Sequence, residues 1–95
     1  MKKIITKREI TKAQKVLARL DENVRDHLEV EAEIVREYAA DRKWDMENDF
    51  QHRLAGGLEM LTVMQIITRE EQSLIFRYYL NEKSQYMMEK LTHTA

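Results

Sequence analysis

One stretch decides the fold: residues 6–40 read TKREITKAQKVLARLDENVRDHLEVEAEIVREYAA. Apolar side chains recur through it at intervals of three and four positions, at Ile10, Ala13, Leu17, Leu20, Val24, Leu28, Ala32, Val35 and Ala39. Such intervals place these side chains on one face of an α-helix. No Gly or Pro interrupts the stretch. The pattern therefore predicts a single continuous helix over residues 7–40.

The start of this helix is marked twice. Thr6 and Glu9 have the spacing of a capping box, in which each side chain bonds the free backbone N–H of the other residue. Ile5 and Ile10 flank the cap at the spacing of a hydrophobic staple. We therefore expect the first helix to begin at residue 7.

A second helix is predicted over residues 46–66, with Asp45 as a candidate N-cap. Its apolar stripe comprises Met46, Phe50, Leu54, Leu58, Leu61 and Met64. The polar segment 41–49 contains no Gly or Pro, so it is open whether the first two helices are continuous through it. Gly56 and Gly57 lie inside the second helix, where each costs about 1 kcal/mol relative to Ala. They indicate either a close approach by another helix or a kink.

The third helix is predicted over residues 69–90. Thr68 and Glu71 repeat the capping-box spacing, and Glu70 adds a second carboxylate in the first turn, where the helix dipole favours negative charge. Together the three patterns indicate an all-α fold in one domain, residues 1–95. We expect an antiparallel three-helix bundle with a long first helix, assembled as a dimer.

The composition excludes several classes of protein. The 95 residues include no Cys, which rules out disulfides and thiol chemistry. No apolar run approaches the roughly 20 residues that span a bilayer. Residues 1–7 are basic but lack the apolar stretch of a signal peptide. We expect a cytoplasmic protein without a membrane partner.

Signals for catalysis are weak. Asp49 with His52, and His27 with Glu31, have spacings that place two metal ligands on one helix face. Carboxylate metal bundles need several such pairs on different helices, so a metal-binding bundle is only the third hypothesis. The sequence has no Gly-rich phosphate loop, nucleophile elbow or zinc-ligand spacing. We expect no catalytic residue, no cofactor and no metal.

The charges are segregated along the chain, although the net charge is only −1. Residues 1–19 carry seven basic side chains against Glu9 alone, whereas residues 21–50 carry eleven acidic side chains against four basic ones. One stripe of the predicted first helix is thus basic and then acidic, and two antiparallel copies would pair these charges about a two-fold axis. The pairs are Arg8 with Glu37, Lys12 with Glu33, Lys15 with Glu29 and Arg19 with Asp26. The simpler alternative is a solvated charged face.

The basic half of that stripe supports a second hypothesis, a small nucleic-acid-associated regulator. Its candidate phosphate contacts are Lys7, Arg8, Lys12, Lys15 and Arg19. Two features weigh against it. The acidic segment that follows would repel a polyanion, and no aromatic residue lies among the basic ones to stack on bases.

The second and third predicted helices carry apolar residues on two faces. A three-helix monomer leaves one of these faces uncovered unless the long first helix folds over both, and an uncovered apolar face marks an interface. The candidate partner-interface residues are Trp44, Met60, Val63, Ile67, Phe76, Tyr79, Leu80 and Met87. Trp44 is the preferred single contact, because its amphipathic ring lies in a polar segment and such rings are enriched at interfaces.

These observations favour a small, non-enzymatic protein–protein interaction module. We expect it to act as a homodimer and to regulate or inhibit a larger protein, in the manner of small accessory proteins of bacteria and phages. A nucleic-acid partner is the alternative.

Overall fold

The computed structural model describes residues 5–93, which form four α-helices and no strand. The helices are α1 (Lys7–Arg19), α2 (Glu22–Ala40), α3 (Trp44–Val63) and α4 (Arg69–His93). Within these residues no helix combines the length and the apolar character needed to cross a membrane. The prediction of an all-α fold is confirmed, but the prediction of three helices is wrong.

The predicted first helix is in fact two helices, joined at Leu20 and Asp21. Both joint residues have extended backbone, with ψ angles of 153° and 139°. The Asp21 carboxylate accepts a hydrogen bond of 3.1 Å from the backbone N–H of Asn23 and so caps the start of α2. The outer limits of the predicted helix, Lys7 and Ala40, are correct.

The break is hidden in the apolar pattern because both sides of it face the same core. Leu17, before the joint, Leu20, in the joint, and Leu28, after it, are all buried in one cluster. The interval between apolar residues therefore stays at three or four across a joint that is not helical. The capping preference of Asp21 is the only local sign of the break, because neither Gly nor Pro marks it.

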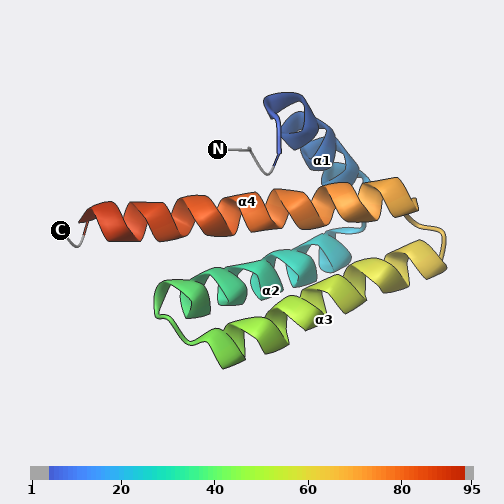
Figure 1. Ribbon diagram of the computed structural model, residues 1–95. Coiled ribbons are helices and arrows are strands. Elements are labelled where there is room, and N and C mark those ends of the chain that lie inside the picture. Colours follow the sequence, from blue (N-terminus) through green and yellow to red (C-terminus); the bar gives the residue numbers. More distant parts are fainter. Residues whose placement is uncertain (1–4, 94–95) are drawn as a thin grey trace.

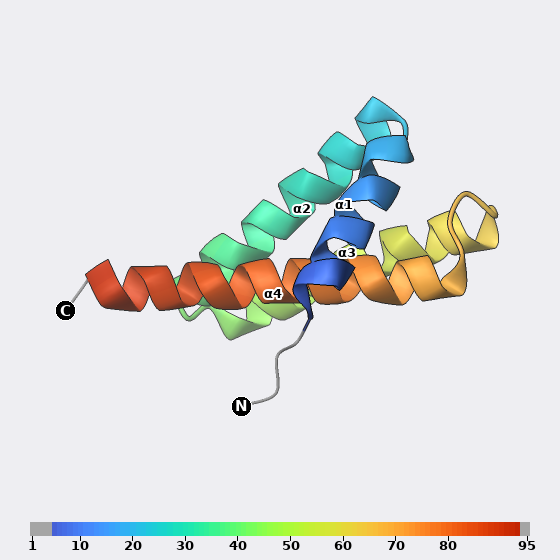
Figure 2. The same cartoon turned by 90° about the horizontal axis from the view of Figure 1, so that it is seen from above.

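Helix α4 lies between two layers, with α1 on one side and the α2–α3 pair on the other (Figure 1). Helices α2 and α3 form an antiparallel hairpin, and both pack against α4. Figure 2 shows that α1 crosses α4 instead of running alongside it. The joint at residues 20–21 makes this crossing possible, because it lets α1 turn away from the axis of α2.

Two apolar clusters hold these layers together. The larger one joins all four helices and contains Val16, Leu17, Leu20, Leu28, Ala32, Leu54, Leu58, Leu61, Ile67, Ile75 and Tyr79. The smaller one fixes the start of α1 on α4 through Ile5, Ala13 and Leu74, with Ile10 and Tyr78 packed against it. Ile5 and Ile10, the predicted hydrophobic staple, thus belong to the smaller cluster.

Helices α2 and α3 end in the same way. After α2, the N–H of Arg42 bonds Ala39 O at 3.1 Å and the N–H of Lys43 bonds Tyr38 O at 2.9 Å. After α3, the N–H of Gln65 bonds Thr62 O and the N–H of Ile66 bonds Leu61 O. These are the paired bonds of a Schellman motif, and its left-handed position is taken by Arg42 (φ 58°) and Gln65 (φ 62°) in place of Gly.

The Schellman motif at Arg42 answers the open question about residues 41–49, because α2 and α3 are separate helices. Helix α3 begins at Trp44, two residues before the predicted start, and Asp45 lies inside it instead of capping it. Helix α3 ends at Val63, three residues before the predicted end at 66.

Both predicted capping boxes are present. At Thr6, the backbone N–H bonds Glu9 Oε1 at 3.1 Å, and the N–H of Glu9 bonds the Thr6 hydroxyl at 3.2 Å. At Thr68, the corresponding bonds with Glu71 measure 2.9 and 3.1 Å. Helix α4 therefore begins at the predicted residue, and it continues to His93 instead of ending at 90.

The two glycines of α3 are not required by a close helix contact. A methyl group added at Gly56 would meet nothing within 4 Å, and one added at Gly57 would meet Leu28 Cδ2 at 3.7 Å, an ordinary van der Waals distance. Gly56→Ala is therefore expected to raise the free energy of unfolding by about 1 kcal/mol, the helix-propensity gain. Urea unfolding followed by circular dichroism measures this. Gly57→Ala is the matched control and gains a contact with Leu28 as well. A lower stability for Gly56→Ala would contradict open space at this position.

Candidate functional site

The eight predicted interface residues fall into three groups. Trp44, Met60 and Val63 are 53%, 58% and 67% exposed. Three others are half-buried along α4: Phe76, Leu80 and Met87. Ile67 and Tyr79 are buried in the core of the single chain, at 4% and 6% exposure. The surface available to a partner is therefore smaller than the predicted set, and Ile67 and Tyr79 lie outside it.

The burial of Met64 and Ile67 is the reverse of what the sequence predicts. Met64 belongs to the predicted core stripe but is 61% exposed, whereas Ile67 belongs to the predicted outer face but is buried. The reason is the end of α3 at Val63, after which Gln65 adopts left-handed backbone. The helical spacing on which the prediction depends no longer applies beyond that residue.

The largest concentration of exposed apolar side chains lies at this end of α3. It consists of Met60, Val63, Met64 and Ile66, each between 48% and 67% exposed. We refer to these four residues as the tip patch. Single exposed apolar residues are normal on a protein surface, but four within seven positions make this end of α3 the candidate interface. Met64 and Ile66 were missed by the sequence prediction.

An apolar groove of about 220 Å³ lies between α3 and α4 at the same end of the molecule. Its walls are Ala55, Leu58, Arg69, Gln72, Ser73 and Phe76. Arg69 starts α4 directly after the turn that carries the tip patch. Phe76, one of the predicted interface residues, thus lines a groove next to the patch.

Trp44 lies at the other end of α3. The register of the α3–α4 pair is set by two contacts: Thr62 bonds Gln72 at 2.7 Å, and Lys83 bonds Glu47 at 2.7 Å. Trp44 precedes Glu47 by about one turn. It is therefore roughly 24 Å from Met60 along the helix, at about 1.5 Å per residue. The structure does not bring Trp44 into the tip patch.

The basic stripe of α1 lies beside the acidic first turn of α4. Arg19 forms an ion pair with Glu71, and Arg77 of α4 forms one with Glu9 at 2.8 Å. Each of these glutamates also closes the capping box of its own helix. Each of the two carboxylates thus caps the start of its own helix and also forms an ion pair between α1 and α4. Some of the basic residues of α1 are therefore paired with acidic residues of the same chain.

This arrangement corrects the predicted charge pairing between two copies. That pairing required the basic and acidic halves to share one straight helix, and the joint at Leu20 and Asp21 places them on α1 and α2. Arg19 has Glu71 as its partner, and the Glu37 carboxylate accepts a hydrogen bond from the Tyr86 hydroxyl. The straight helix on which the four pairs centred near residue 22 were based is therefore wrong.

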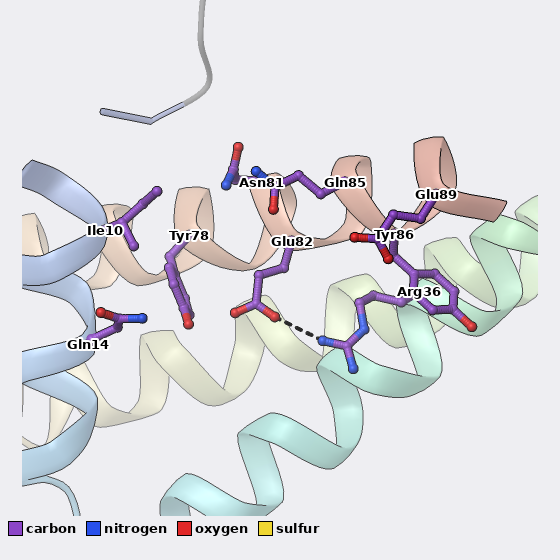
Figure 3. Close-up of a pocket in the computed structure, with 9 residues that line it drawn as sticks. All are labelled: Ile10, Gln14, Arg36, Tyr78, Asn81, Glu82, Gln85, Tyr86 and Glu89. Atoms are coloured by element: carbon purple, nitrogen blue, oxygen red, sulfur yellow. Dashed lines mark hydrogen bonds and ion pairs between the residues drawn. The ribbon is translucent and has the colours of Figure 1, made fainter. Parts of the chain in front are cut away.

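A polar groove of about 340 Å³ opens between α1, α2 and α4. Figure 3 shows Arg36 and Glu82 facing each other across it, joined by an ion pair of 2.9 Å. Tyr78 lies on one side of this pair and Tyr86 on the other. Burial, and then a hydrogen bond with Glu82, raise the pKa of the Tyr78 hydroxyl. A hydrogen bond with Glu37, and then burial, raise the pKa of the Tyr86 hydroxyl, so both tyrosines stay neutral near pH 7.

The two residue pairs weighed as metal ligands stay isolated. His27 contacts Glu31 at 3.0 Å, and His52 and Asp49 are exposed on α3. Across residues 5–93, no three His, Cys, Asp or Glu side chains are grouped so that they could hold a metal ion. Comparisons with protein-family models, with curated proteins and with solved structures found no match to this chain. The chemistry of its surfaces is therefore the basis for assigning a function.

The two ion pairs between α1 and α4 predict a response to pH. A backbone hydrogen bond from Thr6 and then Arg77 lower the pKa of Glu9 below 4.5, and the bond from Thr68, with Arg19, lowers that of Glu71. A carboxylate with a depressed pKa stabilises the fold above its unfolded pKa, and this stabilisation is lost as the pH falls through the folded value. The melting temperature is therefore expected to fall as the pH decreases below about 4.5.

The double variant Glu9→Gln with Glu71→Gln tests this expectation, because Gln keeps both capping boxes but cannot titrate. Its melting temperature should fall less between pH 6 and pH 3 than that of the unmodified protein. Glu59→Gln is the control, since Glu59 is exposed and forms no ion pair within residues 5–93. An equal fall in the double variant and in the control would show that the ion pairs have no part in the response.

Proposed function

We propose that this chain is a non-enzymatic protein–protein interaction module that acts as a homodimer and regulates or inhibits a larger protein. The tip patch is the observation that supports the proposal most directly. It places Met60, Val63, Met64 and Ile66 in water at one end of the molecule. Three of the four are on or next to the last turn of a regular helix, which is a surface suited to packing against another helix.

The tip patch alone is too small for a stable complex. Complete burial of one such side chain contributes about 1.5–3 kcal/mol, so the exposed halves of four contribute about 4 kcal/mol. Association itself costs at least about 4 kcal/mol. The interface therefore has to extend beyond the patch. The apolar groove that Phe76 lines is the adjoining surface, and we include it in the proposed interface.

The composition of the patch suits an adaptable contact. Met60 and Met64 have unbranched, polarisable side chains that pack against surfaces of different shape. Such residues are common where one surface has to accept more than one partner. A module that binds itself and a larger protein through one end of the molecule would use this property.

Val63→Glu tests the dimer. A charge placed in an apolar interface is costly to desolvate, so the dissociation constant of the dimer should rise about thirtyfold or more, as for a hot-spot residue. Sedimentation or light scattering over a range of concentrations measures this. Val30→Glu is the matched control, because Val30 is 54% exposed on α2 and is not one of the four residues of the tip patch. An unmodified protein that stays monomeric at every concentration would contradict the homodimer.

Binding to a larger protein is tested separately with the same two variants. Immobilised unmodified protein should retain a partner from the host extract that Val63→Glu does not retain and Val30→Glu does. Retention by all three proteins would show that the tip patch is not the binding surface.

The nucleic-acid hypothesis keeps one supporting observation. Arg8, Lys12 and Lys15 are exposed on α1 and form no ion pair within residues 5–93. The carboxylates of Glu70 and Glu71 lie beside Lys12 in the same cleft, however, and weaken its attraction for a phosphate.

Gel retardation of a duplex at low salt tests this alternative. The hypothesis predicts that Arg8→Glu with Lys12→Glu abolishes retardation, since phosphate contacts dominate such binding. Arg42→Glu with Lys43→Glu makes the same change of charge outside the stripe and should leave retardation intact. If both double variants bind alike, or if the unmodified protein does not retard the duplex, the basic stripe is not a nucleic-acid site.

A further inference from the structure

The apolar groove between α3 and α4 has the size of a single large side chain. Its volume is about 220 Å³, which is below the roughly 300 Å³ at which pockets hold drug-sized ligands. Ala55, Leu58 and Phe76 are its apolar walls, and Arg69 and Ser73 line it as exposed residues. A side chain that fills this groove therefore needs a large apolar surface and has to suit a neighbouring positive charge.

Trp44 has the side chain that matches these walls. Among residues 5–93 it is the only aromatic residue that is exposed, at 53%. An indole combines a large apolar ring with one N–H donor, and its face attracts a guanidinium group more strongly than other aromatic rings do. The apolar walls accept the ring, the Ser73 hydroxyl is an acceptor for the N–H, and Arg69 supplies the guanidinium.

Trp44 cannot fill the groove of its own chain. Trp44 and Ala55 belong to the same helix, α3, and lie roughly 16 Å apart along its axis at about 1.5 Å per residue. A side chain does not span this distance. The eleven positions between them are also about three helical turns, so Trp44 and the groove lie on the same side of α3. Each chain therefore presents a tryptophan and a groove on one face.

This face is complementary to a second copy of itself. When two α3 helices lie antiparallel, a two-fold axis midway between Trp44 and Ala55 brings Trp44 of each copy to the groove of the other. The two contacts are equivalent by symmetry, so one copy supplies what the other needs and the pair is closed. A third copy finds neither a groove nor a tryptophan left to occupy.

The charges on this face suit the antiparallel pair. Arg69 and Asp45, which follows Trp44, form no ion pair within residues 5–93, and the arrangement brings Arg69 of one copy near Asp45 of the other. Trp44, Asn48, Gln51 and Ala55 follow one another at intervals of three and four and so form one stripe. The two middle residues face their counterparts at the axis, and because both are uncharged, this stripe opposes no like charges there.

We propose that the apolar groove between α3 and α4 receives Trp44 of a second copy of the chain, with Arg69 over the indole ring and beside Asp45. This contact rests on the homodimer proposed above and supplies apolar burial that the tip patch alone lacks. Leu80 and Met87 are half-buried on α4 near the middle of the stripe, since Lys83, between them in sequence, bonds Gln51 at 3.0 Å. A second copy in this position is expected to cover them as well.

The fluorescence of Trp44, the single tryptophan of the chain, reports the contact directly. As the full chain is concentrated, its emission should move to shorter wavelength and its quenching by acrylamide should decrease, over the concentrations at which light scattering detects the dimer. A dimer in which the emission of Trp44 is unchanged would overturn the contact and leave the homodimer standing. A monomer at every concentration would overturn both.

Three variants locate the contact. Trp44→Ala removes the occupant, and Ser73→Tyr fills the groove from its exposed edge. Each should raise the dissociation constant of the dimer about thirtyfold or more, as for a hot-spot residue. Met46→Ala is the matched control, because Met46 is 42% exposed and, two positions from Trp44, lies on another side of α3. Equal weakening in Trp44→Ala and Met46→Ala would overturn the contact, and weakening in Ser73→Tyr alone would place another segment of the second copy in the groove.

Mixing two of these variants tests whether the contact forms between copies. A pair of one Trp44→Ala chain and one Ser73→Tyr chain keeps one tryptophan and one open groove, so it should associate more tightly than either variant alone. Only the Ser73→Tyr chain carries Trp44, and its emission should move to shorter wavelength when the other chain is added. Absence of this change, with both variants folded by circular dichroism, would overturn the proposal.

A charge exchange tests the orientation without the Ser73→Tyr variant. Arg69→Asp places two carboxylates at each contact and should weaken the dimer about tenfold or more, as the loss of a charge-assisted hydrogen bond does. Asp45→Arg added to the same chain restores opposite charges and should restore the dissociation constant. A double variant as weak as Arg69→Asp alone would contradict the antiparallel arrangement.

Discussion

The hydrogen bond between the Asp21 carboxylate and the N–H of Asn23 is the constraint on which the architecture depends. It starts α2 and, together with the extended backbone of Leu20, separates α2 from α1. A straight helix over residues 7–40 would be about 51 Å long at 1.5 Å per residue, which exceeds the 44 Å longest dimension of the molecule. Part of such a helix would extend past the core. The joint instead folds α1 back across α4, where Ala13 is buried against Leu74.

That crossing explains why the segregated charges are compatible with a single folded chain. The basic end of α1 meets the acidic start of α4 through Arg19 and Glu71, and the start of α1 meets the middle of α4 through Glu9 and Arg77. Exposed pairs of this kind contribute at most about 1 kcal/mol each. Their main effect is therefore on the position of α1, while the buried apolar residues supply the stability. The acidic stripe of α2 takes part in none of the ion pairs within residues 5–93.

The features that the sequence predicted correctly are those with a strictly local cause. The capping boxes at Thr6 and Thr68 involve residues three positions apart, and both are present. The apolar intervals also locate the core of α2. The break at Asp21 depends on where a helix ends, and so do the exposure of Met64 and the burial of Ile67. No Gly or Pro marks those places. Arg42 and Gln65 occupy left-handed positions that usually contain Gly, so composition alone gave no indication of the turns.

The turn at Gln65 determines how the tip patch is presented. The N–H groups of Ile66 and Ile67 both point to Leu61 O, at 2.9 and 3.4 Å. Ile67 is anchored in the core while Ile66, its neighbour, is 48% exposed. These bonds and the burial of Ile67 hold the turn, so a partner of the kind proposed above would not have to supply the entropy of ordering it. Preorganisation would matter for a small patch, because the contact energy of the tip patch alone does not exceed the cost of association.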